Sequence, residues 1–225
     1  MKKFILLTSK SWHKDLFNFL KLRANEDWSI ITSKDDFIFS KIKDLNPNKI
    51  FIPHWSHIIP SNIFEKFECI VFHMTDLPYG RGGSPLQNLI VCGHQDTMIS
   101  AIQIDQGVDT GNIYLKKPLS LKGSAKDIFE RATVVIQKMI LEILSSDINP
   151  VPQKGVATIF KRRSAKDGYM NELKEIEEVY DYIRMLDAEG YPPAFIETDS
   201  FKIDFFDSKL INETQITANV RITKK

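Results

Sequence analysis

The stretch CIVFHMTDLPYGRGGSP, residues 69–85, runs from an apolar segment through a histidine into a turn with three glycines around one arginine. Its first residues, CIVFHM, do not alternate between apolar and polar side chains. That pattern is typical of a strand buried on both faces of a parallel sheet. The chain has only 10 glycines in 225 residues, so their concentration in this turn indicates a backbone requirement there.

Similar strand candidates precede this stretch and alternate with segments of helical periodicity. The strand candidates are residues 2–9, 28–33 and 49–55, and the helical segments are residues 11–22, 37–45 and 60–67. We expect Ser11 to cap the first helix. The alternation predicts an α/β fold, a Rossmann-like, mostly parallel sheet with helices on both faces.

The remainder of the chain has less regular patterns. Ser124 and Asp127 form a capping box that predicts the start of a long helix. The C-terminal residues alternate apolar and polar side chains in two runs, which predicts a short β-hairpin appendage. We therefore expect a main catalytic domain at residues 1–190 and a C-terminal β-hairpin or small sheet at residues 191–225. Further strands are expected at 98–104, 112–121 and 156–163, and helices at 127–146 and 172–186.

Charge and cysteine content narrow the class of protein. With 30 basic and 29 acidic residues the net charge is +1, which gives no basic surface for nucleic acid or an anionic membrane. The basic cluster 161–163 is interpreted as a solvated patch. Cys69 and Cys92 lie in apolar stretches and are expected to be small buried residues of a reduced, cytoplasmic protein. Neither a signal peptide nor a membrane span is recognisable.

The chemistry is expected at the carboxyl ends of the parallel strands, where open α/β sheets bind ligands. Three predicted loops meet there: residues 54–59, 73–85 and 104–112. The chain lacks zinc-binding spacing, a nucleophile elbow, a phosphate-binding P-loop and a dinucleotide fingerprint. A metal site built from Asp105, Asp109 and His73 is a minor alternative, and no metal is predicted. General acid–base chemistry by His73 with Asp109 remains as the main interpretation.

These residues also resemble a known family. Three segments are similar to the motifs of the folate-dependent formyltransferases: VFH, LPYGRGGSP and IDQGVDTGNI. Asp109 follows His73 at a spacing of 36 positions. The resemblance is specific over about residues 50–165. The segment IRMLDAEGYPPAF, residues 183–195, further resembles the sugar-nucleotide N-formyltransferases, with the pseudaminic-acid branch as one possibility.

The resemblance implies a site and a co-substrate. His73 and Asp109 match the family's catalytic histidine and aspartate, and Arg81 matches the arginine that helps to hold 10-formyltetrahydrofolate. The glycines of the turn would then let the backbone approach this co-substrate closely. The residues assigned to its pocket are His57, Ile58, Ile59, Arg81, Gly82, Gly83, Asp105, Gln106, Gly107 and Val108.

One position departs from the family pattern. Val71 stands where the family has a catalytic asparagine, whose amide donates to the formyl oxygen. Loss of one such donor typically costs about 3 to 4 kcal/mol in the barrier. Asn88 is the first candidate for a substitute donor, because an amide can reproduce the hydrogen bond. His54, Thr75 and Gln87 are the other candidates.

The predicted function is transfer of a formyl group to the amine of a nucleotide-linked amino sugar in bacterial surface-glycan biosynthesis. The alternatives are another amine acceptor, glycinamide ribonucleotide or an aminoacyl-tRNA, or a non-catalytic folate- or sugar-binding relative. The short C-terminal segment and balanced charge argue against tRNA. An apolar face on the predicted hairpin needs cover, either from its own domain or from a second copy, so a homodimer is one expectation.

Overall fold

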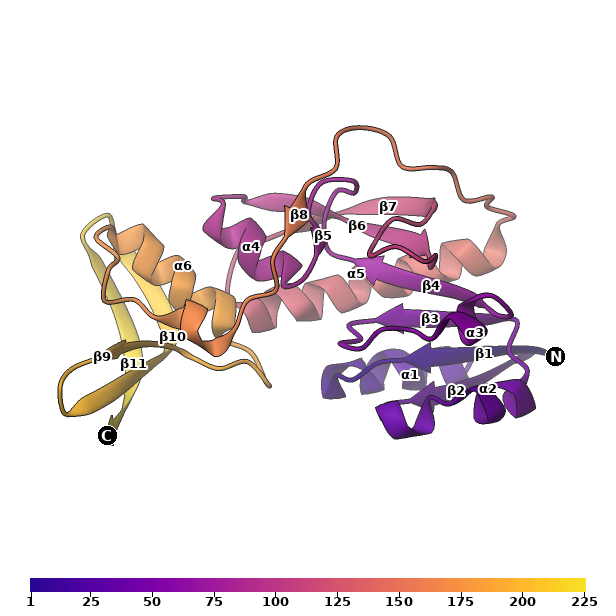
Figure 1. Cartoon of the computed structure of the whole chain (residues 1–225), viewed down its shortest axis with the longest axis horizontal. Coiled ribbons are helices and arrows are strands. Elements are labelled where there is room, and N and C mark those ends of the chain that lie inside the picture. Colours follow the sequence, from indigo (N-terminus) through magenta and orange to yellow (C-terminus); the bar gives the residue numbers. More distant parts are fainter. The chain divides into compact units, whose positions relative to one another are not determined.

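The computed structural model describes residues 1–225, and its contacts divide the chain into two compact units. The first unit comprises residues 1–81, 98–119 and 130–159, and the second comprises residues 82–97, 120–129 and 160–225. We describe each unit by itself, with the element labels of Figure 1.

The first unit is built on a six-stranded sheet with the order β2-β1-β3-β4-β6-β7 (Figure 1). β1, β2, β3 and β4 run parallel, and β6 pairs antiparallel with β4. The mostly parallel α/β fold predicted from the sequence is therefore confirmed. The strand bounds are β1 Lys2–Leu7, β2 Glu26–Ile31, β3 Lys49–Pro53, β4 Glu68–His73, β6 Asp96–Gln103 and β7 Ile113–Ser120.

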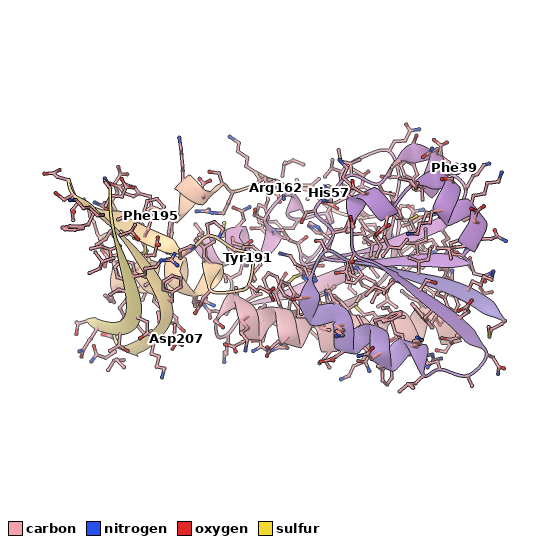
Figure 2. The ribbon with its side chains drawn as sticks, turned by 90° about the horizontal axis from the view of Figure 1, so that it is seen from below. Phe39, His57, Arg162, Tyr191, Phe195 and Asp207 are labelled. Atoms are coloured by element: carbon pink, nitrogen blue, oxygen red, sulfur yellow. The ribbon has the colours of Figure 1, made fainter.

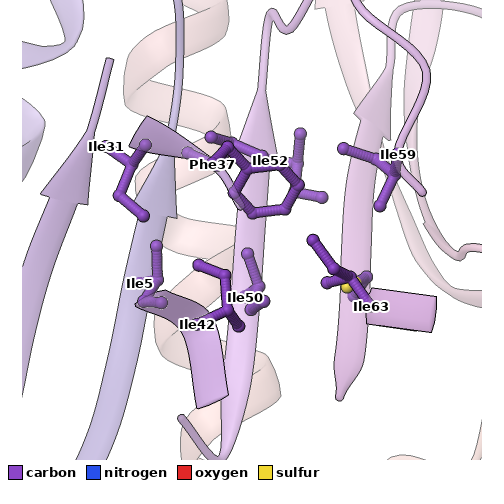
Figure 3. Close-up of a cluster of buried hydrophobic side chains, with 10 residues drawn as sticks. Ile5, Ile31, Phe37, Ile42, Ile50, Ile52, Ile59 and Ile63 are labelled. Atoms are coloured by element: carbon purple, nitrogen blue, oxygen red, sulfur yellow. The ribbon is translucent and has the colours of Figure 1, made fainter. Parts of the chain in front are cut away.

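Side chains from alternate strand positions form the core on one face of this sheet. Figure 3 shows part of this cluster, in which Ile5, Ile50 and Ile52 of the strands meet Ile42 of α2 and Ile63 of α3. Helices α1 and α5 lie on the other side of the sheet (Figure 1). The continuous apolar pattern of these strands thus reflects cover on both faces.

The helices follow the predicted periodicity, but several boundaries differ. Ser11 does not cap the first helix, because a short 3-10 turn, Ser11–His13, precedes α1 (Lys14–Lys21) and neither start has a side-chain cap. Phe19 of α1 is exposed. α3 is a single turn. The remaining bounds in this unit are a 3-10 turn at Lys34–Asp36, α2 Phe39–Leu45 and α3 Ser61–Phe64.

The long helix α5 (Ala125–Ser145) contributes residues to both units. Its predicted capping box is present. The Asp127 N–H donates to Ser124 Oγ at 3.2 Å, and Asp127 Oδ2 accepts from the Ser124 N–H at 2.9 Å. This pairing satisfies backbone donors that a helix start leaves without partners.

The second unit contains two helices and a three-stranded sheet of order β11-β10-β9. β10 pairs antiparallel with both neighbours, which confirms the C-terminal hairpin and adds a third strand. The hairpin has a register shift after Phe206, beside Asp207, which has a positive φ of 50° (labelled in Figure 2). The bounds are α4 Pro85–Val91, a 3-10 turn Ala165–Gly168, α6 Ile176–Leu186, β9 Ala194–Glu197, β10 Phe201–Asn212 and β11 Gln215–Lys224.

Two short strands, β5 (Arg81–Gly82) and β8 (Ile159–Phe160), pair with each other. β8 is much shorter than the strand predicted over residues 156–163. In the second unit, Phe201, Val220 and Ile222 are exposed on the C-terminal sheet, so the homodimer stays a prediction. The domain boundary at residue 190 also stays a prediction.

None of the helices combines the length and the apolar character that crossing a bilayer requires. Cys69 is buried, as expected, whereas Cys92 is exposed, because it follows the last turn of α4. Both cysteines are free thiols.

A buried arginine ties the parts of the second unit together. Arg184 on α6 is only 4% exposed, and its guanidinium donates to Asp181 at 2.6 Å, to the Leu121 carbonyl at 2.7 Å and to the Gly123 carbonyl at 3.0 Å. These bonds anchor the loop before α5 to α6.

We predict that Arg184→Met lowers the free energy of unfolding by about 3 kcal/mol, because it leaves a carboxylate and two carbonyls without their donor. Urea unfolding followed by circular dichroism measures this. Arg162→Met, at an exposed position, serves as the control and should change stability by less than about 0.5 kcal/mol. Equal midpoints for the two variants would contradict the role assigned to Arg184.

Candidate active site

The candidate site is centred on His73, the last residue of β4. Its side chain is 7% exposed. Nε2 lies 2.8 Å from the Gly80 carbonyl, and Nδ1 lies 3.5 Å from Asp109 Oδ2. Because a carbonyl only accepts, Nε2 carries the hydrogen, which leaves Nδ1 as the position that exchanges a proton beside Asp109. The structure thus brings together the two residues that the sequence paired.

The turn after β4 is held from two directions. Lys116 of β7 donates to Asp76 Oδ1 and to the Leu77 carbonyl, each at 2.5 Å. Further along, the Gly80 N–H donates to Thr158 Oγ1 at 2.7 Å and the Arg81 N–H donates to the Thr158 carbonyl at 3.0 Å. These bonds fix the Gly80 carbonyl that orients His73.

The glycines at positions 82 and 83 have a different cause from the one expected. Gly82 has a φ of 104°, and a Cβ there would lie 2.4 Å from the Phe160 carbonyl oxygen. A Cβ on Gly83 would lie 2.6 Å from Arg162 Cβ. The segment around β8 therefore occupies the space beside both glycines, and close approach of the chain to itself explains them. Their assignment to the co-substrate pocket stays an untested prediction.

The loop between β6 and β7 places Asp109 in a left-handed conformation, with a φ of 54°. Asp105 shapes this loop from within, because its Oδ1 accepts from the Gly107 N–H at 3.1 Å and from Thr110 Oγ1 at 2.5 Å. Val108 is exposed. Within 105–109, Asp109 is the acidic side chain that reaches His73, while Asp105 organises the turn; a role for Gln106 stays a prediction.

Residues 57–59 separate into two environments. His57, labelled in Figure 2, and Ile58 line a pocket of about 340 Å³ with Trp55, and Ile58 is 91% exposed. Ile59 instead belongs to the buried core. The other residues that line the pocket are Lys34, Asp35, Phe37, Ile38 and Pro60. Its walls combine apolar and aromatic side chains with the charged Lys34 and Asp35, and they lie in the loops that follow β2 and β3.

The proposed substitute for the family asparagine is not supported by the structure. Both Asn88 amide hydrogens are used, since Nδ2 donates to the Gly83 and Lys161 carbonyls at 2.9 Å each. Val71 packs against core residues on the sheet face that carries Ile52. Asn88 would have to give up one of these bonds to act as the substitute donor, and that role stays a prediction.

The other three candidates for that donor also have partners. Gln87 donates to the Met185 carbonyl at 3.1 Å, and Thr75 Oγ1 lies 3.4 Å from the Gly80 carbonyl. His54 lies 2.8 Å from His13 and 3.1 Å from Met74 Sδ. None of these side chains offers a hydrogen that the fold leaves uncommitted.

The pair of His13 and His54 was not predicted, because neither residue belongs to a recognisable motif. Thr133 of α5 lies 3.4 Å from the second ring nitrogen of His13. Burial, reinforced by Lys10, lowers the pKa of His13 to about 4, and burial lowers the pKa of His54 well below its usual range. Both rings are therefore neutral at neutral pH.

Gln153 was also missed by the sequence analysis. It lies between α5 and β8, in a segment with no periodicity. Its side chain contacts Arg81 and the loop that carries Asp109, with Oε1 2.8 Å from Arg81 Nη2 and Nε2 2.8 Å from the Asp109 carbonyl. Only the position of its partners identifies it.

Comparisons with known proteins agree with this geometry. A formyl transferase family model matches residues 17–141, more than half of the chain, and a model described as methionyl-tRNA formyltransferase, C-terminal domain, matches residues 165–223. The chain belongs to the formyl transferase family. One similar solved structure is a methionyl-tRNA formyltransferase from Clostridium thermocellum, which is 45% identical, with 100% of both chains covered and a TM-score of 0.97.

More distant relatives differ in length or in sequence. A methionyl-tRNA formyltransferase of Thermodesulfovibrio yellowstonii is 31% identical over 67% of this chain, which spans only 52% of that relative. The solved formyltransferase PseJ from Anoxybacillus kamchatkensis is 23% identical, with 70% of this chain and 85% of PseJ covered and a TM-score of 0.58. That likeness concerns the fold alone.

The buried histidine pair makes stability depend on pH. As the pH falls below about 6.5, His13 becomes protonated in the unfolded chain, whereas in the folded protein it stays neutral until the pH reaches about 4. Stability is therefore present above pH 6.5 and is lost across this window, by roughly 3 kcal/mol for His13. Urea unfolding between pH 7 and pH 5 should show this slope, and His13→Gln should flatten it. An unchanged slope in the variant would contradict the assignment.

Proposed function

We propose that the protein is an N-formyltransferase that moves a formyl group from 10-formyltetrahydrofolate to a primary amine. The observation that carries this proposal is the placement of His73 between the Asp109 carboxylate and the Gly80 carbonyl at the carboxyl end of β4. Family membership supports the reaction class, and the position is the one where open α/β sheets bind their substrates.

The reaction needs one proton to move. The neutral amine attacks the formyl carbon, and a tetrahedral oxyanion forms. The new carbon–nitrogen bond remains, the bond from carbon to N10 of the folate breaks, and the proton lost by the amine is gained by N10. His73 Nδ1 accepts this proton and returns it, and Asp109 stabilises the imidazolium that exists between the two steps. The distance of 3.5 Å between His73 Nδ1 and Asp109 Oδ2 leaves Nδ1 able to accept and return this proton.

The oxyanion needs a donor that Val71 cannot supply. Since the nearby amides donate to backbone carbonyls and the Nε2 hydrogen of His73 is bonded to the Gly80 carbonyl, the donor we propose is the Nδ1 hydrogen that His73 gains during the reaction, shared between the oxyanion and Asp109. A charged donor forms stronger hydrogen bonds than a neutral amide, so one imidazolium can offset part of the loss. His73 would then serve both the proton transfer and the developing charge.

The residues present fit the folate co-substrate. The rings of folate have faces that can stack on flat or apolar side chains, and Phe37, Trp55 and Ile58 of the pocket provide such surfaces; the polar edge of the pterin would need partners such as His57, Lys34 or Asp35, which also line the pocket. Arg81 provides a cation on the turn after His73 for the anionic or carbonyl groups of the donor. The assignment of Arg81 and of residues 105–108 to donor binding rests on the family motif.

For the acceptor we propose a nucleotide-linked amino sugar in surface-glycan biosynthesis. The support is charge. Residues 165–223, matched to the C-terminal domain of methionyl-tRNA formyltransferase, contain six basic and 13 acidic residues, a formal charge of −7. Such a segment repels a phosphate backbone, whereas nucleic-acid-binding domains carry basic surfaces. PseJ was solved in complex with a nucleotide-linked formamido sugar and tetrahydrofolate.

Aminoacyl-tRNA is the other candidate acceptor and the one that the comparisons favour, because the similar protein from Clostridium thermocellum and the one from Thermodesulfovibrio yellowstonii are both named methionyl-tRNA formyltransferase. We further propose a cytoplasmic location, which the two free thiols support. A homodimer through the C-terminal sheet remains part of the proposal, motivated by its exposed apolar residues.

We predict that His73→Ala lowers kcat by about a hundredfold or more while tetrahydrofolate still binds, because the proton carrier is lost and the pocket is kept. Asp109→Asn should lower kcat by a similar factor. Steady-state assays with 10-formyltetrahydrofolate and titration with tetrahydrofolate separate the two effects. His94→Ala is the control and should retain full activity. Activity of His73→Ala within a few-fold of wild type would show that the role is wrong.

The acceptor is tested in a direct competition. We expect formylation of nucleotide-linked amino sugars and no formylation of methionyl-tRNA at about 0.15 M salt, where a negatively charged segment gains nothing from phosphate contacts. Mass spectrometry of both products decides. Formylated tRNA without any formylated sugar would contradict the sugar proposal and leave formyl transfer itself intact.

A further inference from the structure

The side chain of Gln153 connects two motif segments: the turn that carries Arg81 and the loop that carries Asp109. Its Oε1 accepts two hydrogen bonds from Arg81, from Nε at 3.2 Å and from Nη2 at 2.8 Å. Its Nε2 donates to the carbonyls of Asp109 at 2.8 Å and Gly111 at 2.9 Å. One half-buried amide therefore holds the arginine of the turn and the loop of the acidic residue.

The chemistry of the amide suits this position. The two ends of the Gln153 amide meet partners of opposite kind. The oxygen faces the Arg81 guanidinium, which offers only donors, and the nitrogen faces two carbonyls, which offer only acceptors. A carboxylate could hold Arg81 but would oppose the carbonyls. An ammonium could hold the carbonyls but would repel Arg81. Of the charged and neutral side chains of this length, the amide satisfies all four bonds.

The backbone around Gln153 is fixed as well. Thr158, five residues later, accepts from Gly80 and Arg81 and donates its N–H to the Pro78 carbonyl at 3.3 Å. On the other side, a Cβ on Gly111 would lie 1.6 Å from the Gln103 carbonyl oxygen, so the loop closes tightly onto β6. The segment around Thr158 and the loop at Gly111 are therefore both held in place, and neither can move freely to make up for the loss of the Gln153 contacts.

We propose that Gln153 is a positioning residue that sets the distance between Arg81 and the His73–Asp109 pair. The inference rests on the proposed function, in which Arg81 holds the folate donor and Asp109 holds the proton carrier. A misplacement of about 1 Å between donor and catalytic group can cost about a hundredfold in rate. The Gln153 amide thus connects Arg81, proposed to bind the donor, with the loop of Asp109, proposed to support proton transfer.

Three substitutions separate the two halves of this link. Gln153→Glu retains the acceptor for Arg81 and loses both donors to the loop. Gln153→Lys retains donors for the loop and loses the Arg81 contact. Gln153→Met has a similar length and loses both. Gln215→Glu and Gln215→Lys, at an exposed position of β11, are the matched controls.

The readouts are kcat, the Kd for tetrahydrofolate, and hydrogen–deuterium exchange of residues 105–111. For Gln153→Glu we expect kcat to fall by about tenfold or more, loop exchange to increase, and the Kd to stay within about threefold. For Gln153→Lys we expect the Kd to rise by about tenfold and loop exchange to stay close to wild type. Gln153→Met should show both defects, and the Gln215 controls neither.

A purely structural role would move kcat, Kd and melting temperature together in all three variants, and that outcome would overturn the inference. Wild-type values in all three would overturn it too. If the wild-type protein transfers no formyl group to any acceptor, the proposed function fails. Loop exchange still tests the link in that case, because unchanged exchange in Gln153→Glu and Gln153→Met would refute it.

Discussion

Burial of β4 on both faces is the constraint on which the rest of the site depends. Its apolar residues lie between β3 and β6 in a sheet that helices cover on each side, and the polar side chain that follows them, His73, therefore appears at the carboxyl edge. The turn that follows His73 places the Gly80 carbonyl beside Nε2 of the histidine ring. The loop after β6 brings a carboxylate, of Asp109, near Nδ1. The ring is oriented by the backbone on one side and by charge on the other.

The sequence predicted the strands and the His73–Asp109 pair because both depend on local pattern and on motif spacing. The uninterrupted apolar run of β4 and the capping box of α5 are such local signals. It could not predict what faces Gly82 and Gly83, because the neighbouring segment lies far along the chain. It likewise placed Asn88 near the reaction on residue type alone, while its amide hydrogens satisfy the Gly83 and Lys161 carbonyls.

Long-range polar contacts account for the remaining surprises. Gln153 and the His13–His54 pair acquire their roles from partners at least 41 residues away, and neither has a periodicity that would reveal it. Both show the same physical rule, that a buried or half-buried polar group must find partners within the fold. Val71 needs no such partner, because its half-buried apolar side chain packs against core residues. A valine is therefore compatible with the core even though it removes a donor from the reaction.

The most direct test of this account follows the formyl carbon itself. With 10-formyltetrahydrofolate labelled with ¹³C at the formyl group, the protein and a nucleotide-linked amino sugar, nuclear magnetic resonance should show the label leaving the folate and appearing as the formamide of the sugar. With Asp109→Asn the label should remain on the folate over the same time. Release of the label as free formate, or its retention on folate with wild-type protein and every amine offered, would contradict formyl transfer by the His73–Asp109 pair.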